Sequence, residues 1–80
     1  MKLQINTYAL VKDFFRPAFE FELQNNATIT DLRDALIKWK PESSSILSRC
    51  RFAIGDTLVG DNEPLHESSS IHIIPPSSGG

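Results

Sequence analysis

The sequence predicts a single α+β domain in which a mixed sheet carries one main helix across it. Two stretches of alternating polarity come first, at residues 2–7 and 18–24. An amphipathic helix follows at about 28–39, and further strand-like segments end in the apolar run 71–74. Each kind of element has an apolar side that must be covered, so we expect the helix to lie across one face of the sheet.

The first two strands are predicted to pair as an antiparallel hairpin. Leu3 and Ile5 alternate with polar residues, and so do Phe19, Phe21 and Leu23. A period of two is typical of strands with one buried and one solvated face. Because the strands are close in sequence, we expect them to be neighbours in the sheet.

The segment between these strands, residues 8–17, is too apolar for a free loop. We predict that it folds back under the sheet. A helical turn is expected near residues 11–14.

The main helix has a clear start and a clear end. Thr28 and Asp31 match a capping box, in which the hydroxyl and the carboxylate accept hydrogen bonds from backbone N–H groups of the first turn. Pro41 disfavours further helix at the preceding residue. The residues expected to face the core, at helical spacing, are Ile29, Leu32, Ala35, Leu36 and Trp39.

The second half of the chain reads as a polar connector followed by three short strands. Residues 42–45 are polar and lead into a predicted short helical turn at 46–47. Strands are predicted at 51–54 and 57–59, with a turn at Gly55 and Asp56.

The last strand is expected to present alternate residues to opposite faces. If Ile71 and Ile73 face the core, His72 and Ile74 face outward. Ile74 is then a candidate docking residue, although it could equally cover a loop. Leu65 is expected to anchor the loop that precedes this strand.

The order strand, strand, helix, strand, short strand, strand is that of the ubiquitin-like β-grasp fold. If the last strand lies beside the first, the two must be parallel and the helix supplies the crossover. The C-terminus then leaves at a corner of the sheet. A small ferredoxin-like domain is the alternative, but it normally has a second full helix. We predict a domain at 1–76 and a flexible tail at 77–80.

Composition excludes several classes of function. The net charge is −2 and the basic residues are scattered, which does not favour nucleic-acid binding. No apolar stretch approaches the roughly 20 residues that span a bilayer, and the N-terminus does not resemble a signal peptide. Cys50 is the only cysteine, so we expect a reducing, cytoplasmic location.

The C-terminal tail carries the strongest functional signal. Proline cannot donate to a sheet ladder, so Pro75 and Pro76 should end the strand in a stiff, extended base. Gly79 and Gly80 lack a Cβ and can pass through a channel too narrow for side chains. Residues 75–80 reach about 20 Å when extended. The terminal carboxylate of Gly80 is therefore the candidate working group.

No other group in the sequence suggests chemistry. Two histidines and one cysteine lack metal-ligand spacing, so no metal site is predicted. Cys50 is interpreted as a small buried thiol, and His66 and His72 as surface residues. No nucleophile elbow or phosphate-binding loop is present, so we expect no activity from the chain alone.

The run from Ile73 to Gly80 resembles the C-terminal signature of the small subunit of molybdopterin synthase, the MoaD-type sulfur carriers. Weaker matches occur in the right order along the chain, at residues 8–13, 28–32 and 52–59. The sequence departs from the family pattern at residues 67–70, where the family often has an acidic turn. It also departs at Gly55, often Asn, and at Ser77, commonly Val or Ile.

The resemblance implies a sulfur carrier for molybdenum cofactor biosynthesis. An E1-like adenylyltransferase would use ATP and Mg to adenylate Gly80, and a sulfur donor protein would convert it to a thiocarboxylate. The large synthase subunit would then use this sulfur on cyclic pyranopterin monophosphate, and no cofactor would be bound by the chain itself. The residues implied to contact these partners are Gly79, Ser78, Ser77, Pro76, Pro75 and Ile74.

Three other functions remain open from the sequence. One is sulfur carriage for another pathway, such as thiamin synthesis, whose carriers tend to lack the two prolines. Another is a ubiquitin-like protein modifier that forms isopeptides through Gly80. The last is an interaction domain with an inert tail.

Overall fold

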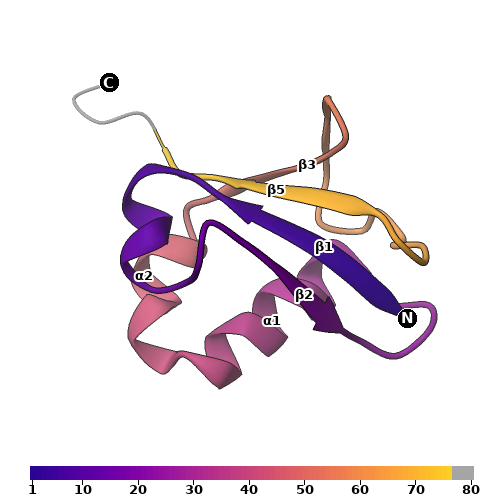
Figure 1. The fold of residues 1–80 in the computed structure, drawn as a ribbon, viewed down its shortest axis with the longest axis horizontal. Coiled ribbons are helices and arrows are strands. Elements are labelled where there is room, and N and C mark those ends of the chain that lie inside the picture. Colours follow the sequence, from indigo (N-terminus) through magenta and orange to yellow (C-terminus); the bar gives the residue numbers. More distant parts are fainter. Residues whose placement is uncertain (77–80) are drawn as a thin grey trace.

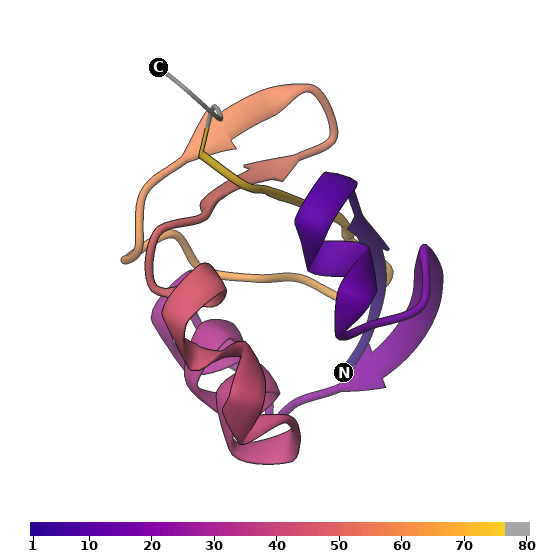
Figure 2. The ribbon, with the colours of Figure 1, turned by 90° about the vertical axis from the view of Figure 1, so that its left-hand side faces the viewer.

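A computed structural model, which describes residues 1–76, confirms the α+β architecture (Figure 1). Its described residues form a five-stranded mixed sheet in the order β2-β1-β5-β3-β4. The helices cover one face of this sheet, and the other face is open (Figure 2). The elements are β1 (Lys2–Thr7), η1 (Ala9–Asp13), β2 (Ala18–Glu22), α1 (Ile29–Trp39), η2 (Pro41–Ser43), α2 (Ser44–Leu47), β3 (Arg51–Ile54), β4 (Thr57–Val59) and β5 (Ser70–Ile74).

The predicted pairings of the first and last strands are confirmed. β1 is antiparallel to β2, with Ile5 opposite Phe19. On its other side β1 is parallel to β5, with Ile5 opposite Ile71. Because β5 also pairs with β3, the last strand is central and the chain leaves it at a corner of the sheet. The β-grasp order is therefore observed.

The segment between β1 and β2 folds back as predicted, with its helical turn slightly earlier, at Ala9–Asp13. Val11 is fully buried and Phe15 is 5% exposed, so this segment closes one end of the core. Thr7 links the two ends of this segment. The Thr7 hydroxyl donates to the Arg16 carbonyl at 2.8 Å, and the Thr7 amide donates to the Pro17 carbonyl at 2.9 Å.

Helix α1 begins at the predicted cap. The Thr28 amide donates to the Asp31 carboxylate at 2.9 Å, and the Asp31 amide donates to the Thr28 hydroxyl at 3.4 Å. Ile29, Leu32 and Leu36 have no exposed surface. The helix therefore supplies the centre of the core through one stripe, as its spacing predicts.

The prediction that Trp39 is a core residue is wrong in part, because its side chain is 52% exposed. Trp39 is the last residue of α1 and lies next to the edge strand β2. One side of its ring packs on Phe15, Phe19 and Phe21, with ring centroids 5.6, 5.8 and 5.8 Å away. Within residues 1–76, no further strand lies beyond β2 to cover the other side of the ring.

The polar connector is more helical than predicted. It forms η2 and the four-residue helix α2, which begins at Ser44 rather than at Ile46. Ser43 is fully buried, and its hydroxyl donates to the Lys40 carbonyl at 2.6 Å. Such short turns are not the second full helix of a ferredoxin-like domain.

Arg33 forms a partly buried link that the sequence pattern did not predict. Its side chain is 16% exposed and is paired with Asp61 at 3.0 Å. It also donates to the carbonyl of Leu47 at 3.2 Å and to that of Cys50 at 3.3 Å. The guanidinium lies 4.9 Å from the centroid of the Phe52 ring. One side chain thus joins α1 to the turn before β3.

Replacing Arg33 with alanine should destabilise the fold. The Leu47 and Cys50 carbonyls would lose a charged donor, at a cost of about 1–3 kcal/mol. The measurement is the urea midpoint at constant m-value. Lys38→Ala, at an exposed position of the same helix, is the matched control and should change stability by less than about 0.5 kcal/mol. Equal effects of the two substitutions would contradict this role of Arg33.

Candidate functional site

The chain leaves the sheet with the side-chain alternation that the sequence predicts. Ile71 and Ile73 have no exposed surface, whereas His72 is half-buried and Ile74 is 36% exposed on the opposite face. Pro75 and Pro76 follow directly, beyond the last pairing of β5 with β3 (Figure 1). The open face of the sheet is therefore continuous with the base of the tail.

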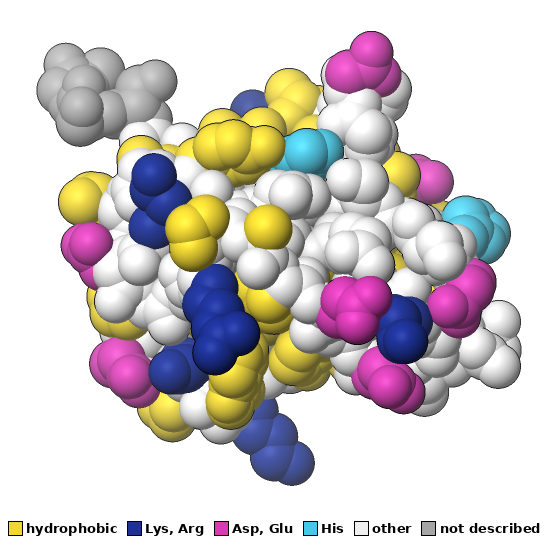
Figure 3. Space-filling model, in the orientation of Figure 1, with side chains coloured by type: hydrophobic (Ala, Val, Ile, Leu, Met, Phe, Trp, Pro, Cys, Tyr) yellow, Lys and Arg dark blue, Asp and Glu magenta, His cyan; other side chains and the backbone are white. Residues whose placement is uncertain are grey.

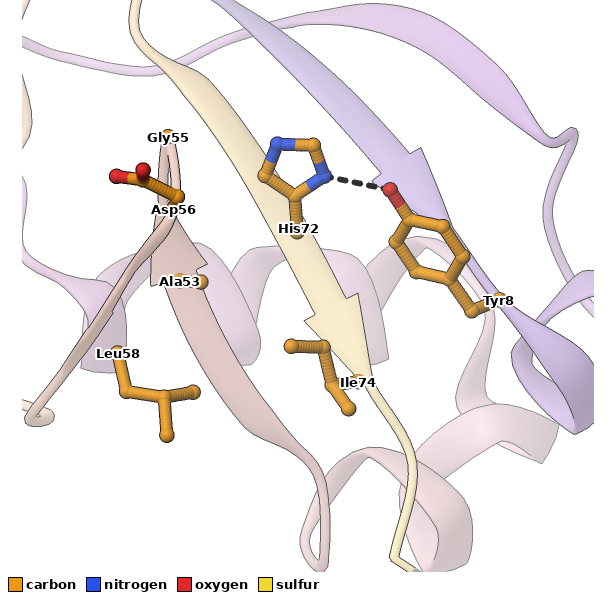
Figure 4. A pocket seen from close by; sticks show the side chains of 7 residues that line it. All are labelled: Tyr8, Ala53, Gly55, Asp56, Leu58, His72 and Ile74. Atoms are coloured by element: carbon orange, nitrogen blue, oxygen red, sulfur yellow. Dashed lines mark hydrogen bonds between the residues drawn. The ribbon is translucent and has the colours of Figure 1, made fainter.

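An open pocket of about 480 Å³ lies on this face, next to the point where the chain exits (Figure 4). Its walls come from β3, β4, β5 and the residue after β1. In Figure 3, hydrophobic side chains lie beside a histidine along the upper part of the molecule. The lining residues are Tyr8, Ala53, Gly55, Asp56, Leu58, His72 and Ile74.

Tyr8 and His72 form one wall of the pocket. The Tyr8 hydroxyl lies 2.7 Å from His72 Nδ1, and the two rings stack with centroids 5.8 Å apart. The second ring nitrogen of His72 lies 3.5 Å from the Ser70 hydroxyl. These contacts fix the imidazole against the tyrosine, so the wall is held in place before any partner arrives.

The contact between Tyr8 and His72 was not predicted from the sequence, although the pattern contains the signal for it. The parallel register places Asn6 opposite His72. Tyr8 follows two residues later, on the same side of the chain. Parity combined with the predicted parallel pairing could therefore have placed the two rings together.

The turn between β3 and β4 forms the opposite wall. Gly55 has φ +62°, a conformation that glycine and asparagine adopt most easily. This explains why glycine is acceptable at a position where the MoaD-type carriers that the sequence resembles often have asparagine. Leu58 follows this turn and is 53% exposed. Leu58 and Ile74 together make the pocket largely apolar. Exposed apolar surface of this kind is typical of a docking site.

The other predicted tail residues are placed only in part. Pro75 is half-buried and Pro76 is exposed at the end of the described chain. Ser77, Ser78, Gly79 and Gly80, including the proposed working carboxylate, lie outside the described residues. The predicted boundary between domain and tail therefore stays a prediction.

The remaining candidate residues of the described chain have structural surroundings. Among residues 1–76, no three His, Cys, Asp or Glu side chains come together as a metal site requires. Within the same residues, no helix is long and apolar enough to cross a membrane. Cys50 is buried, as interpreted from the sequence, and its thiol donates to the Ile46 carbonyl at 3.2 Å.

Burial raises the pKa of the Cys50 thiol above its ordinary value, opposed by the positive charges of Arg33 and Arg49. We expect iodoacetamide to alkylate the Cys50 thiol more than about tenfold more slowly in the folded protein than in urea, because reaction requires local opening.

The raised pKa of Cys50 also makes stability depend on pH. As pH rises, the thiol ionises in the unfolded chain before it ionises in the folded protein. The free energy of unfolding should therefore fall once pH exceeds about 8.5. Cys50→Ala should lack this component in urea melts.

A comparison with protein-family models identifies the family of the chain. The model described as the ThiS family matches residues 6–80, nearly the whole chain. The chain belongs to the ThiS family. The chain is also 37% identical over 62 residues to the molybdopterin synthase sulfur carrier subunit of Chlamydomonas reinhardtii, covering 75% of each protein. The resemblance to the small subunit of molybdopterin synthase is therefore confirmed.

Several solved structures share the fold. The small archaeal modifier protein 1 of Haloferax volcanii superposes with a TM-score of 0.82 at 14% identity, covering 95% of this chain and 98% of that one. A complex of subunits 1 and 2 of the molybdopterin-converting factor from Helicobacter pylori matches with a TM-score of 0.71 at 23% identity, covering 100% of both chains. At these identities the matches establish the β-grasp fold alone.

Proposed function

We propose that the chain is the sulfur carrier subunit of molybdopterin synthase and carries sulfur as a thiocarboxylate on Gly80. The observation that carries the proposal is the position of β5. This strand is central, ends at a sheet corner and leads through Pro75 and Pro76 to a Gly-Gly terminus. The similarity to the algal sulfur carrier subunit supports the same function.

The rigid part of the molecule suits the presentation of a carboxylate. β5 is hydrogen-bonded on both sides, so the base of the tail is fixed by the core. Pro75 and Pro76 continue it as a stiff segment. The four residues after Pro76 add at most about 14 Å of extended chain. A partner that grips the sheet face would therefore receive the carboxylate at a defined depth.

The proposed chemistry takes place in the partners. An E1-like enzyme with ATP and Mg would let the Gly80 carboxylate attack the α-phosphorus, releasing pyrophosphate and leaving an acyl-adenylate. A persulfide of the donor protein would attack the acyl carbon, and AMP would leave. A second thiol would then reduce the resulting acyl disulfide, which frees the Gly80 thiocarboxylate and leaves the two donor thiols joined as a disulfide. After transfer of the sulfur to the pterin, water would cleave the remaining acyl–sulfur bond and regenerate the carboxylate. A terminal glycine leaves that acyl carbon unobstructed.

The pocket beside the exit is the proposed docking site for these partners. Its apolar residues Leu58 and Ile74 flank the base of the tail, and the Tyr8–His72 pair gives one polar edge. Subunit 1 of the Helicobacter pylori factor forms a complex with subunit 2, which supports a large-subunit partner here. The E1-like enzyme and the large subunit would both bind the same C-terminal tail. We therefore propose that they bind in turn and exclude each other.

The deciding experiment is an intact mass measurement. The chain is incubated with an E1-like activating enzyme, ATP, Mg and a sulfur donor. The expected gain corresponds to exchange of one oxygen for one sulfur at Gly80, located by fragmentation. An unchanged mass in a mixture that thiocarboxylates an authentic carrier would refute sulfur carriage. Formation of molybdopterin after addition of the large synthase subunit and the pterin precursor would identify the pathway.

A protein modifier is the second candidate, because small archaeal modifier protein 1 shares this fold. A modifier would join Gly80 to lysine side chains through isopeptide bonds. Its products would be larger conjugates on denaturing gels rather than a sulfur-exchanged free chain. The same activation mixture, supplemented with cell lysate, distinguishes the two outcomes.

A further inference from the structure

A second hollow shares no lining residue with the pocket at the exit of the chain. It has a volume of about 410 Å³ and lies between the outer edge of β2 and the end of α1. Figure 3 shows basic and hydrophobic side chains side by side on the face where β2 runs. We call this hollow the edge groove. Its lining residues are Phe14, Arg16, Phe19, Glu20, Trp39 and Lys40.

Among the described residues 1–76, β2 is an outermost strand of the sheet, and the edge groove runs along backbone groups of β2 that pair with no other strand there. The Thr7 amide donates to the Pro17 carbonyl and the Leu23 amide to the Met1 carbonyl, so odd-numbered residues of β2 face β1. In an antiparallel pair the intervening residues point their N–H and C=O groups the other way. These outward groups belong to Ala18, Glu20 and Glu22.

An edge with free donors and acceptors is a template for one more strand. The groove supplies apolar surface next to that template. Trp39 is 52% exposed there, although its ring already packs on Phe19 and Phe21. An apolar side chain of an added strand would cover the part of the indole that the core leaves open. Backbone pairing and side-chain burial would thus act together at one place.

The charges of the groove indicate the chemistry of the occupant. Arg16 and Lys40 line the groove, and neither forms an ion pair within residues 1–76. The Lys40 ammonium lies 5.3 Å from the centroid of the Trp39 ring. Glu20 is the only acidic residue of the lining, and its carboxylate contacts Lys2 and Gln4 of β1. A carboxylate on the occupant would therefore be attracted to the groove.

We propose that the edge groove binds an extended, acidic–apolar peptide segment of a partner protein as a sixth strand of the sheet, antiparallel or parallel to β2. An apolar residue packs on Trp39 and Phe19, and an acidic residue lies between Arg16 and Lys40. A second copy of this chain fits less well, because antiparallel pairing centred on β2 places two Glu20 residues opposite each other.

This site is independent of the proposed function. The edge groove and the pocket at the exit share no lining residue. The edge groove lies at the outer edge of β2, whereas the other pocket lies over β3, β4 and β5, with Tyr8 as one wall. A partner held at the groove would leave the tail and its docking face available. The groove therefore offers a way to tether the carrier to an assembly without blocking transfer.

The test uses the intrinsic fluorescence of Trp39, the only tryptophan. The probe is a blocked synthetic heptapeptide of alternating valine and threonine with aspartate at one end. We expect a saturable change in Trp39 emission. In amide NMR spectra the N–H groups of Ala18, Glu20 and Glu22 should shift and become protected from exchange. The double variant Arg16→Glu, Lys40→Glu should bind at least about tenfold more weakly.

Matched controls define the result. A heptapeptide with lysine replacing aspartate should bind at least about tenfold more weakly, and one with a central proline should not pair with β2. Leu58→Ala, at the other pocket, should bind the probe normally. The proposal is overturned if the probe gives no saturable change or if its shifts map to the Tyr8–His72 pocket. It is also overturned if Trp39 emission depends on protein concentration alone, which would indicate a second copy in the groove.

Discussion

Deleting Gly80 should lower sulfur transfer to the pterin acceptor by at least about 10²-fold while leaving the fold intact. The shortened chain still ends in a glycine carboxylate, on Gly79, but that carboxylate reaches roughly 3.5 Å less far. Misplacement of a reacting group by as little as 1 Å can cost about 10²-fold in rate. The assay combines the activating enzyme, ATP, the sulfur donor, the large subunit and the pterin, and the product is quantified as molybdopterin.

Stability measurements separate this effect from unfolding. Gly80 lies beyond the described domain, so its deletion should change the free energy of unfolding by less than about 0.5 kcal/mol. Adding one alanine after Gly80 is the converse variant and should fail in the same assay, because it places a Cβ at the acyl position. Ser78→Ala keeps length and terminus and should remain active. Undiminished transfer by the deletion variant would refute the role of the tail.

The sequence was most informative where local patterns and topology agree. The alternation in β5 predicted which of its isoleucines are buried, and Ile71 and Ile73 have no exposed surface. The capping box at Thr28 predicted the start of α1, and its two hydrogen bonds are present. The sequence predicted that β1 and β5 would be parallel if they were neighbours, with the helix as the crossover, and the two strands do pair in parallel. Each of these depends on contacts that chain geometry enforces.

The features that the sequence did not predict depend on the tertiary neighbours of residues at the edge of the fold. Helical spacing placed Trp39 toward the core, but spacing carries no information on whether a strand lies beyond β2. Arg33 is similar: its spacing placed it on the polar side of α1, and only the path of the chain after α2 brings the carbonyls of Leu47 and Cys50 to it. Periodicity specifies the side of an element, whereas tertiary neighbours determine how much of that side is covered.

The sequence predicted part of the candidate site but not the shape of the pocket. Ile74 was singled out by parity, and it does line the pocket at the exit. Leu58 was not singled out, because a short strand of three residues carries too little pattern to show which face is open. The pocket exists because the Gly55 turn brings β4 beside β3 and leaves Leu58 uncovered at 53% exposure.

Replacing Leu58 with aspartate should weaken binding of the large synthase subunit by at least about 30-fold. A central apolar contact of an interface typically contributes about 2 kcal/mol or more, and burial of an unpaired carboxylate adds a desolvation cost. Leu58 is 53% exposed in the free chain, so the fold itself loses little. The measurement is the dissociation constant by isothermal titration calorimetry, with thermal melts of the free variant.

Three comparisons decide whether the loss arises at the docking face. Ser45→Asp adds the same charge at an exposed position of α2, on the helical side of the sheet, and should bind normally. Leu58→Met keeps apolar volume and should lose less than about tenfold. Ile74→Asp should reproduce the Leu58→Asp effect, because both side chains line the pocket beside the exit. If Ile74→Asp weakens binding and Leu58→Asp does not, the partner grips the base of the tail alone and the pocket is not its docking site.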